Sequence, residues 1–282
     1  MYQENIYPSP FHVEHEMFYM GEHGGKGEKR RERNRTPEEI ARWNLHKRVK
    51  HVRRLIQANF VPGDYMVTLK FPKGYRPMID EVKKCYAAFR EIMRKEYALQ
   101  KKTMKYIYRI EIGERGGVHL HCVMNRLDDG LEIMSRAWRK ARGKTAIEDM
   151  LAEGTRELPD MVVMDGRVDV KLLYLEGGYQ ELAEYLLKPV KGGENLSADE
   201  LKTVSAYGCS RNMKKPEPVR KKYTHWTMRR ILEAGPEKIN TDLALRKKYL
   251  RPGFLIDKNT WQVGTNPVTG MTYLYFTEVR IT

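Results

Sequence analysis

The chain has 282 residues, a formal net charge of +15, and 41% hydrophobic and 32% charged residues. These proportions are typical of a globular protein with a substantial core, and the positive excess favours a polyanionic partner such as nucleic acid. No apolar run approaches membrane-spanning length, MYQENIYPSP lacks the apolar core of a signal peptide, and three scattered cysteines argue against a disulfide framework. The sequence therefore predicts a cytoplasmic protein without a membrane-bound part.

Residues 1–35 end in GEHGGKGEKRRERNR, a run of glycine and polar or charged residues without an apolar side chain. Such a composition predicts a flexible basic arm. A helix is expected to begin at Thr36, because this N-cap is followed by Pro37 and two acidic residues in the first turn. The helix is heavily basic, which is typical both of a phosphate-contacting helix and of an ordinary solvated face.

The middle of the chain alternates strand and helix patterns in the order β-α-β-β-α-β. This order predicts an α+β domain with a ferredoxin-like, RRM-like antiparallel sheet and helices over one face. We expect the domain to occupy residues 36–190, with a core at about 60–190, and residues 191–282 to form a basic extension with a hairpin around Asn266 and Pro267. The expected core elements are strands at 65–71, 105–112, 118–124 and 168–175 and helices that begin near Pro77 and Leu131.

The central hairpin, KYIYRIEIGERGGVHLHCVM from Lys105 to Met124, carries a candidate metal site. His119 and His121 lie two residues apart on its second strand, so both imidazoles project from one face of the sheet. Glu111, near the end of the first strand, can join them across the turn, but its face depends on a register that the sequence leaves open. Two imidazoles and one carboxylate with room for solvent suit Mg²⁺ or Mn²⁺. The same pattern also occurs where strand histidines are only packed or solvated.

A helix is predicted for residues 179–188, between a pair of glycines and Pro189. Tyr185 and Lys188 are three residues apart and share a helix face, whereas Tyr179 is six residues from Tyr185 and points elsewhere. Only one tyrosine is therefore presented together with the lysine. The alternative interpretation of Tyr185 is a half-buried aromatic residue with a solvated hydroxyl, as most of the 17 tyrosines must be.

Together these residues suit a phosphodiester transesterification. A divalent ion held by Glu111, His119 and His121 would act as a Lewis acid on the scissile phosphate. Tyr185 would attack the phosphorus, and Lys188 would stabilise the phenolate or the charge on phosphorus, because a phenol that titrates near about pH 10 is a weak nucleophile at neutral pH. The product would be a DNA 5′-phosphate joined to Tyr185 and a free 3′-hydroxyl.

Three stretches, in order, resemble the motifs of HUH endonucleases of the rolling-circle replication initiator type, the single-tyrosine Rep proteins of small phages, plasmids and single-stranded DNA viruses. VTLKF at 67–71 resembles the first motif, IEIGERGGVHLHCVM at 110–124 the metal motif with its His-hydrophobic-His, and AEYLLKP at 183–189 the Tyr-x-x-Lys motif. The resemblance spans about residues 60–190 and implies an HUH endonuclease domain that nicks and rejoins origin DNA. It implies metal ligation by His119, His121 and Glu111, with Tyr185 as the nucleophile.

The resemblance also implies partners, namely single-stranded DNA, origin hairpin DNA and the replication machinery of a bacterial host of a phage, plasmid or integrated element. A host helicase is expected as well, because the chain has no G-x-x-x-x-G-K-[ST] phosphate loop. The tail after Lys191 interleaves tyrosines with cations, a composition suited to phosphate contacts and base stacking. The cations expected to contact DNA are Arg211, Lys214, Lys215, Arg220, Lys221 and Lys222.

Three other interpretations compete with this one. A transposase or conjugative relaxase of a mobile element would use the same chemistry, although relaxases carry the tyrosine before the histidine pair. A non-catalytic RRM-like module would share the sheet topology, but it has no need of a Glu-His-His set, and the RRM aromatic signature is missing. A metal-dependent phosphohydrolase that uses water would not require Tyr185.

Overall fold

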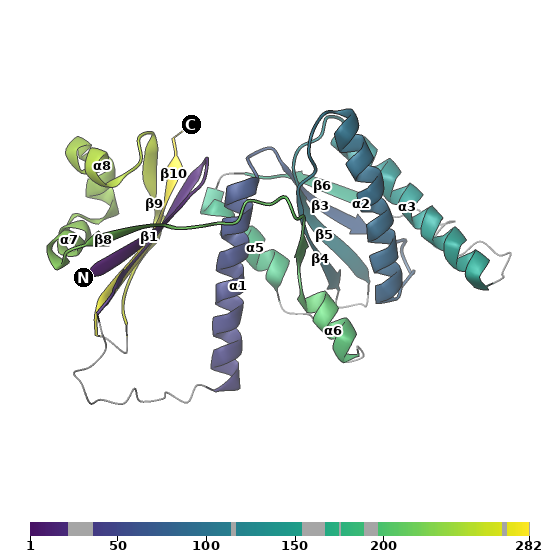
Figure 1. Cartoon of the computed structure of the whole chain (residues 1–282), viewed down its shortest axis with the longest axis horizontal. Helices are drawn as coiled ribbons and strands as arrows, with labels where there is room; N and C mark the ends of the chain where they lie inside the picture. The colour runs from purple at the N-terminus through teal and green to yellow at the C-terminus, as the bar shows by residue number, and fades with distance from the viewer. Residues whose placement is uncertain are drawn as a thin grey trace. The chain divides into compact units, whose positions relative to one another are not determined.

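The computed structural model describes residues 1–21, 36–113, 117–153, 167–174, 176–188, 197–266 and 270–281. The chain forms two compact units, each built around a five-stranded antiparallel sheet (Figure 1). Both units combine distant parts of the sequence. Unit 1 contains Met1–Asn59, Leu175–Ala183 and Lys214–Thr282, and unit 2 contains Phe60–Tyr174 and Glu184–Met213.

Unit 2 has the ferredoxin-like topology that the sequence predicts. Its strands lie in the order β6-β3-β5-β4-β7, and α2 and α3 pack together on one face of the sheet (Figure 1). The chain order β3-α2-β4-β5-α3-β6 confirms the predicted α+β pattern. The elements of unit 2 are β3 (Tyr65–Lys70), α2 (Ile79–Leu99), β4 (Tyr106–Ile112), β5 (Val118–Met124), α3 (Gly130–Glu153), β6 (Val168–Leu172), α6 (Ala198–Ser205) and β7 (Gly208–Cys209), and α5 (Gln180–Leu187) enters it at Glu184.

The core of unit 2 follows from the two periodicities of the sequence. On β3 and β5 alternate residues, such as Val67 and Leu120, point toward the helices and are completely buried. The apolar residues of α2 recur at three- and four-residue steps and cover this face of the sheet, as predicted. Burial of apolar surface, worth roughly 25 cal/mol per Å², is the main stabilising contribution here. The buried residues of α2 are Ile79, Val82, Cys85, Tyr86, Phe89, Met93 and Tyr97.

Unit 1 is built from both ends of the chain. Its strands lie in the order β8-β1-β2-β10-β9, so the N-terminal strands are interior strands of the sheet. The prediction of a flexible arm is therefore wrong for residues 2–19, and the helix predicted at Thr36 belongs to unit 1 instead of the domain at 36–190; residues 22–35 lie outside the described residues. The elements of unit 1 are β1 (Tyr2–Pro8), β2 (His12–Tyr19), α1 (Pro37–Asn59), the 3₁₀ helix η1 (Glu176–Tyr179), β8 (Val219–Tyr223), α7 (His225–Thr241), α8 (Leu243–Tyr249), β9 (Phe254–Thr265) and β10 (Thr272–Arg280).

Charged residues are buried in the middle of the unit 1 sheet, which explains why the hydrophobic pattern did not reveal β1 and β2. His15 Nδ1 lies 2.8 Å from Glu4 Oε1, and His15 Nε2 lies 2.8 Å from Glu278 Oε1. The imidazole also stacks on the ring of Phe276, with centroids 4.4 Å apart. Burial opposes the charged imidazolium, but the two carboxylates outweigh it and raise the pKa of His15 to about 9.

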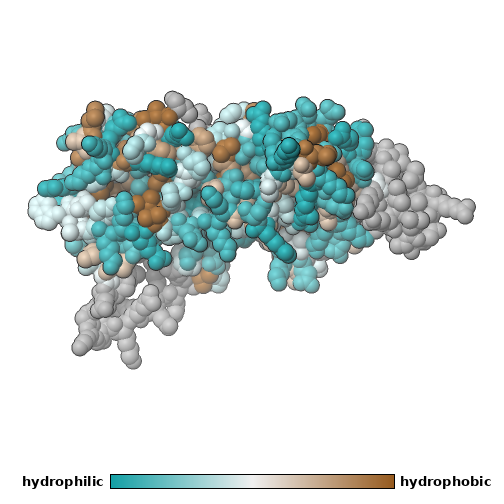
Figure 2. Space-filling model, turned by 45° about the horizontal axis from the view of Figure 1, so that its top comes forward, coloured by the Kyte–Doolittle hydropathy of each residue, from teal (hydrophilic) through white to brown (hydrophobic). Residues whose placement is uncertain are grey.

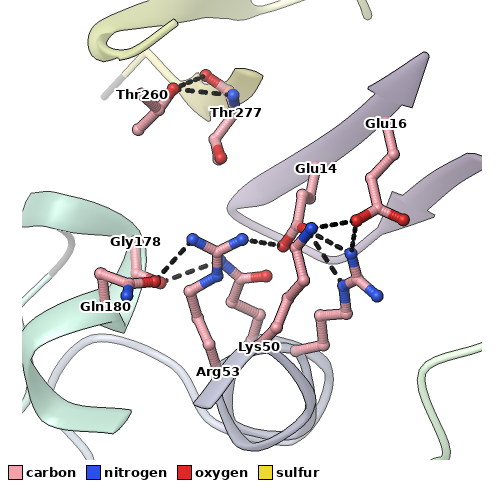
Figure 3. A network of polar contacts seen from close by, with 10 residues as sticks. Glu14, Glu16, Lys50, Arg53, Gly178, Gln180, Thr260 and Thr277 are labelled. Atoms are coloured by element: carbon pink, nitrogen blue, oxygen red, sulfur yellow. Dashed lines mark hydrogen bonds and ion pairs between the residues drawn. The ribbon is translucent and has the colours of Figure 1, made fainter. Parts of the chain in front are cut away.

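Ion pairs hold α1 against the other face of β2. Glu14 and Glu16 project to that face, and Figure 3 shows them beside Lys50 and Arg53 of α1. Arg54 pairs with both carboxylates. These three cations of the basic helix therefore neutralise carboxylates of their own unit.

Local signals in the sequence correctly marked several element ends. Thr36 Oγ1 accepts a hydrogen bond from Glu39 N at 3.2 Å, and Glu39 Oε2 accepts one from Thr36 N at 3.3 Å, which forms a capping box. The predicted C-terminal hairpin is the antiparallel pair β9 and β10, with residues 267–269 outside the described residues. α7 is longer than expected, because it continues to Thr241 through a kink at Gly235, whose φ is +67°.

The surface in view is mostly hydrophilic. In Figure 2 hydrophobic residues form small separate patches among hydrophilic ones. In the part of the chain that the structure describes, no helix combines the length and the apolar character that a membrane crossing requires.

The buried His15 pair should make stability depend on pH. Because the pKa of folded His15, about 9, exceeds the unfolded value of about 6.5, its stabilisation is complete below pH 6.5 and is lost as the pH rises through 9. We expect the free energy of unfolding to fall between pH 6.5 and 9.5 by at most about 3 kcal/mol. Urea unfolding followed by fluorescence of Trp261, whose ring lies 5.3 Å from that of Phe276, measures this.

A His15→Gln variant should be less stable at pH 6.5 and should show a flatter pH dependence, because it lacks the titrating group. His51→Gln, on the exposed side of α1, is the matched control and should keep the wild-type slope. Equal slopes for the two variants would show that His15 does not cause the effect.

Candidate active site

The pairing of β4 with β5 decides which side chains share a face of the unit 2 sheet. Glu111 lies directly opposite His119, and His121 follows two residues later on β5. Directly opposed residues in an antiparallel pair project to the same side, so the carboxylate and both imidazoles lie on the face that points away from α2 and α3. The register that the sequence left open thus brings the three predicted ligands to one face.

The Glu111 carboxylate connects the hairpin to α5. Its Oε2 atom is hydrogen-bonded to His121 Nε2, and its Oε1 atom forms an ion pair with Lys188 Nζ. Burial acts to raise the pKa of Glu111, but these two partners outweigh it and lower the pKa to about 2. The side chain is therefore a carboxylate at neutral pH.

The two imidazoles have different surroundings. His121 is buried, and its Nδ1 atom lies 3.2 Å from Oγ1 of Thr68 on the neighbouring strand β3. His119 is partly exposed, and burial together with repulsion from His121 and Lys70 lowers its pKa. A lowered pKa favours the neutral imidazole, which is the form that binds a metal ion.

Tyr185 of α5 points its hydroxyl at this pair. Its Oη atom lies 3.2 Å from His121 Nε2, and the two rings meet edge to face at 4.9 Å. The side chain is 42% exposed, so solvent and a ligand can reach it. Burial and the negative charge of Glu111 raise the pKa of Tyr185, while Lys188 Nζ lies 4.8 Å from the centre of its ring. The lysine thus contacts both the tyrosine and the carboxylate.

Tyr179 lies apart from Tyr185, in agreement with the six-residue spacing. It belongs to unit 1, where it is 5% exposed and its ring lies 5.3 Å from that of His12. Of these two tyrosines, only Tyr185 contacts His121 and Lys188 through the described residues.

Arg109 is a member of the site that the sequence reasoning missed. It lies directly opposite His121 on β4 and is 5% exposed. Its guanidinium donates hydrogen bonds to the backbone oxygens of Leu186 at 2.8 Å, Lys188 at 2.6 Å and Val204 at 3.0 Å. The available signal was a single arginine two residues before Glu111 on the same face of a strand. Arg109 therefore holds the last turn of α5 and the end of α6 on the sheet.

The donor set fits a divalent cation in its chemistry and in its shared face. One carboxylate and two imidazoles are ligands that Mg²⁺ and Mn²⁺ accept. The carboxylate is at present bound to His121 and Lys188, and the rings of His119 and His121 are 6.4 Å apart. Within the described ranges, no group of three His, Cys, Asp or Glu side chains is arranged around a common metal position.

The six cations predicted to contact DNA are all exposed. Arg211 belongs to unit 2, and the other five belong to unit 1. Three of them lie on β8, which pairs only with β1 and so forms an edge of its sheet. The three on β8 are Arg220, Lys221 and Lys222.

Comparison with known proteins gives one family. Residues 64–189 match the model of a family described as replication-associated protein ORF2. No curated protein matches the chain. The matched segment contains the hairpin with Glu111, His119 and His121 and the helix with Tyr185 and Lys188. Residues 64–189 are thus a domain of this family of replication-associated proteins.

Proposed function

We propose that this protein is a replication initiator that nicks single-stranded origin DNA by metal-dependent transesterification and later rejoins the strand. The observation that carries the proposal is the position of one exposed phenol 3.2 Å from a buried histidine, within the segment that matches a replication-associated family. In this chemistry the phenolic oxygen forms a bond to phosphorus and the bond from phosphorus to the 3′ oxygen breaks. The phenolic proton leaves to solvent, and the 3′ oxygen gains a proton.

Each group has a role that its surroundings support. Tyr185 is the nucleophile, and its raised pKa means that it needs help to lose its proton. Lys188 is close enough to stabilise the phenolate and the charge on the phosphate. Glu111, His119 and His121 would hold Mg²⁺ or Mn²⁺, which would polarise the scissile phosphate.

The exposed cations are the proposed DNA contacts. Single-stranded DNA and an origin hairpin would bind through phosphates to Arg211, Lys214, Lys215, Arg220, Lys221 and Lys222. On the adjacent helix α7, Trp226 is 68% exposed with Arg229 5.9 Å from its ring, which suits stacking of an unpaired base. A helicase and the replication machinery of a bacterial host would supply unwinding and synthesis.

The first test concerns the covalent intermediate. Wild-type protein incubated with Mn²⁺ and single-stranded oligonucleotides from its own replicon should form an adduct that survives SDS and carries the DNA 5′-phosphate. Tyr185→Phe should form none, because it lacks the attacking oxygen. Tyr174→Phe, an equally accessible tyrosine of unit 2 at 71% exposure, is the matched control and should react normally.

An adduct that persists in Tyr185→Phe would reject the assignment. Cleavage without any adduct would point to a phosphohydrolase that uses water. Binding without cleavage would leave an RRM-like module.

The second test concerns the metal. Calorimetric titration of the protein with MnCl₂ in the absence of DNA should detect one site, and His119→Ala should weaken it at least about tenfold, because a ligand is lost. His51→Ala removes a histidine of unit 1 and should leave the titration unchanged. Equal affinity in both variants would contradict metal binding at His119.

Arg109 has a proposed positioning role in this reaction. It grips the backbone of α5 beside Lys188 and one turn from Tyr185, so it fixes the direction of both side chains without contacting a substrate. A displacement of the reacting group by about 1 Å costs on the order of a hundredfold in rate.

Arg109→Lys keeps the charge but cannot reach three carbonyl oxygens. We expect adduct formation to slow by about a hundredfold, while the affinity for the oligonucleotide changes less than about threefold. Hydrogen exchange at Leu186 and Lys188 should increase in the same variant. Arg136→Lys, on the exposed face of α3, is the control. An unchanged rate in Arg109→Lys would contradict the positioning role.

A further inference from the structure

Unit 2 contains a second cationic site, at the opposite end of β4 from Glu111. A pocket of about 690 Å³ lies beside the start of that strand. Its walls come from α2, from the segment before β4 and from the segment after β7, and no lining residue carries a carboxylate. The volume is in the range of ordinary ligand sites. The cations that line it are Arg90, Arg94, Lys102 and Arg211.

The pocket is prearranged by aromatic contacts. Arg90 Nη1 donates to Tyr106 Oη at 3.0 Å, and its guanidinium carbon lies 5.1 Å from the centre of the Tyr86 ring. Arg90 Nε is buried and has no hydrogen-bond partner among the described residues. A rigid guanidinium with an unsatisfied donor suits an anionic oxygen.

The segment after β7 is fixed in the same way. Tyr106 N donates to Ser210 Oγ at 3.2 Å, and Asn212 Nδ2 donates to the backbone oxygen of Met104 at 3.1 Å. Arg211 lies between these two anchors and is exposed. Its backbone position at the pocket is therefore defined before any ligand binds.

We propose that this pocket binds backbone phosphates of DNA, as a second contact to the DNA that the proposed function would cleave. Several cations in one concave site repel one another unless an anion neutralises them. The lining offers cations, hydroxyls and an amide, but its one aromatic residue, Tyr106, is 5% exposed and cannot stack on a base. These features favour a phosphodiester backbone over a nucleotide with its base.

The spacing suits duplex DNA, such as the stem of a hairpin. Five residues separate Tyr106 from Glu111 on β4, which corresponds to about 17 Å at about 3.4 Å per residue. One strand of a duplex places successive phosphates about 3.4 Å apart along the axis. The pocket would therefore contact a duplex about five base pairs from the cleaved bond.

Fluorescence anisotropy in EDTA, where cleavage is prevented, tests this site. The probe is a labelled hairpin oligonucleotide with a stem of about ten base pairs and a single-stranded tail. The pocket variant Arg94→Gln/Arg211→Gln should bind about tenfold more weakly, and the slope of log K against log salt should fall by about 1 to 2. The control Lys95→Gln/Lys140→Gln removes the same charge from exposed positions of α2 and α3 and should stay within about threefold of wild type.

Cys209 provides a local readout, because it is exposed at the pocket while Cys85 and Cys122 are buried. The hairpin should slow alkylation of Cys209 by N-ethylmaleimide at least about threefold in wild type, and should protect it less in the pocket variant. ATP serves as the second probe. Protection by ATP without protection by the hairpin would overturn the assignment to DNA in favour of a free nucleotide.

Equal affinity, salt slope and Cys209 protection in the pocket and control variants would overturn the proposal. The adduct assay with a tail-only oligonucleotide is run separately. A pocket variant that still forms the Tyr185 adduct but fails to bind the stem separates this site from the proposed reaction, and a wild type without any adduct leaves the binding result to be judged by itself.

Discussion

The arrangement of unit 2 depends on the Glu111 carboxylate. The β4–β5 register places it opposite His119, its hydrogen bond to His121 lies within the sheet, and its ion pair with Lys188 reaches α5. A half-buried carboxylate needs such partners, because its charge would otherwise be poorly solvated. The charge balance of one side chain therefore connects the strand that carries the histidines to the helix that carries Tyr185.

The two faces of this sheet have divided roles. One face is an apolar core under α2 and α3, which makes the strands rigid. The other face carries charged residues, and Arg109 binds α5 through backbone oxygens alone. Because that contact uses no side chain of the helix, Tyr185 and Lys188 keep their functional groups available for chemistry.

Unit 1 solves a different problem, since its strands bring many charges into the interior. Each buried carboxylate of Glu4, Glu14 and Glu278 has a cationic or histidine partner from another element. Removal of one partner from such a pair is costly, because the remaining charge stays buried. The first strands are thus tied to β10 and to α1 by specific pairs, and the N-terminal strands and the C-terminal strands are parts of one sheet.

The sequence by itself determined the ferredoxin-like unit, because its strands and helices bury regular apolar stripes, and it singled out Glu111, His119, His121, Tyr185 and Lys188 from their spacing. Three features were decided only by the tertiary structure. The face of Glu111 depends on strand register, the role of Arg109 depends on carbonyl groups about 80 to 95 residues away, and the strands at residues 2–19 are buried through pairs such as His15 with Glu278. Contacts between residues so distant in the chain leave no periodic pattern, so local spacing cannot reveal them.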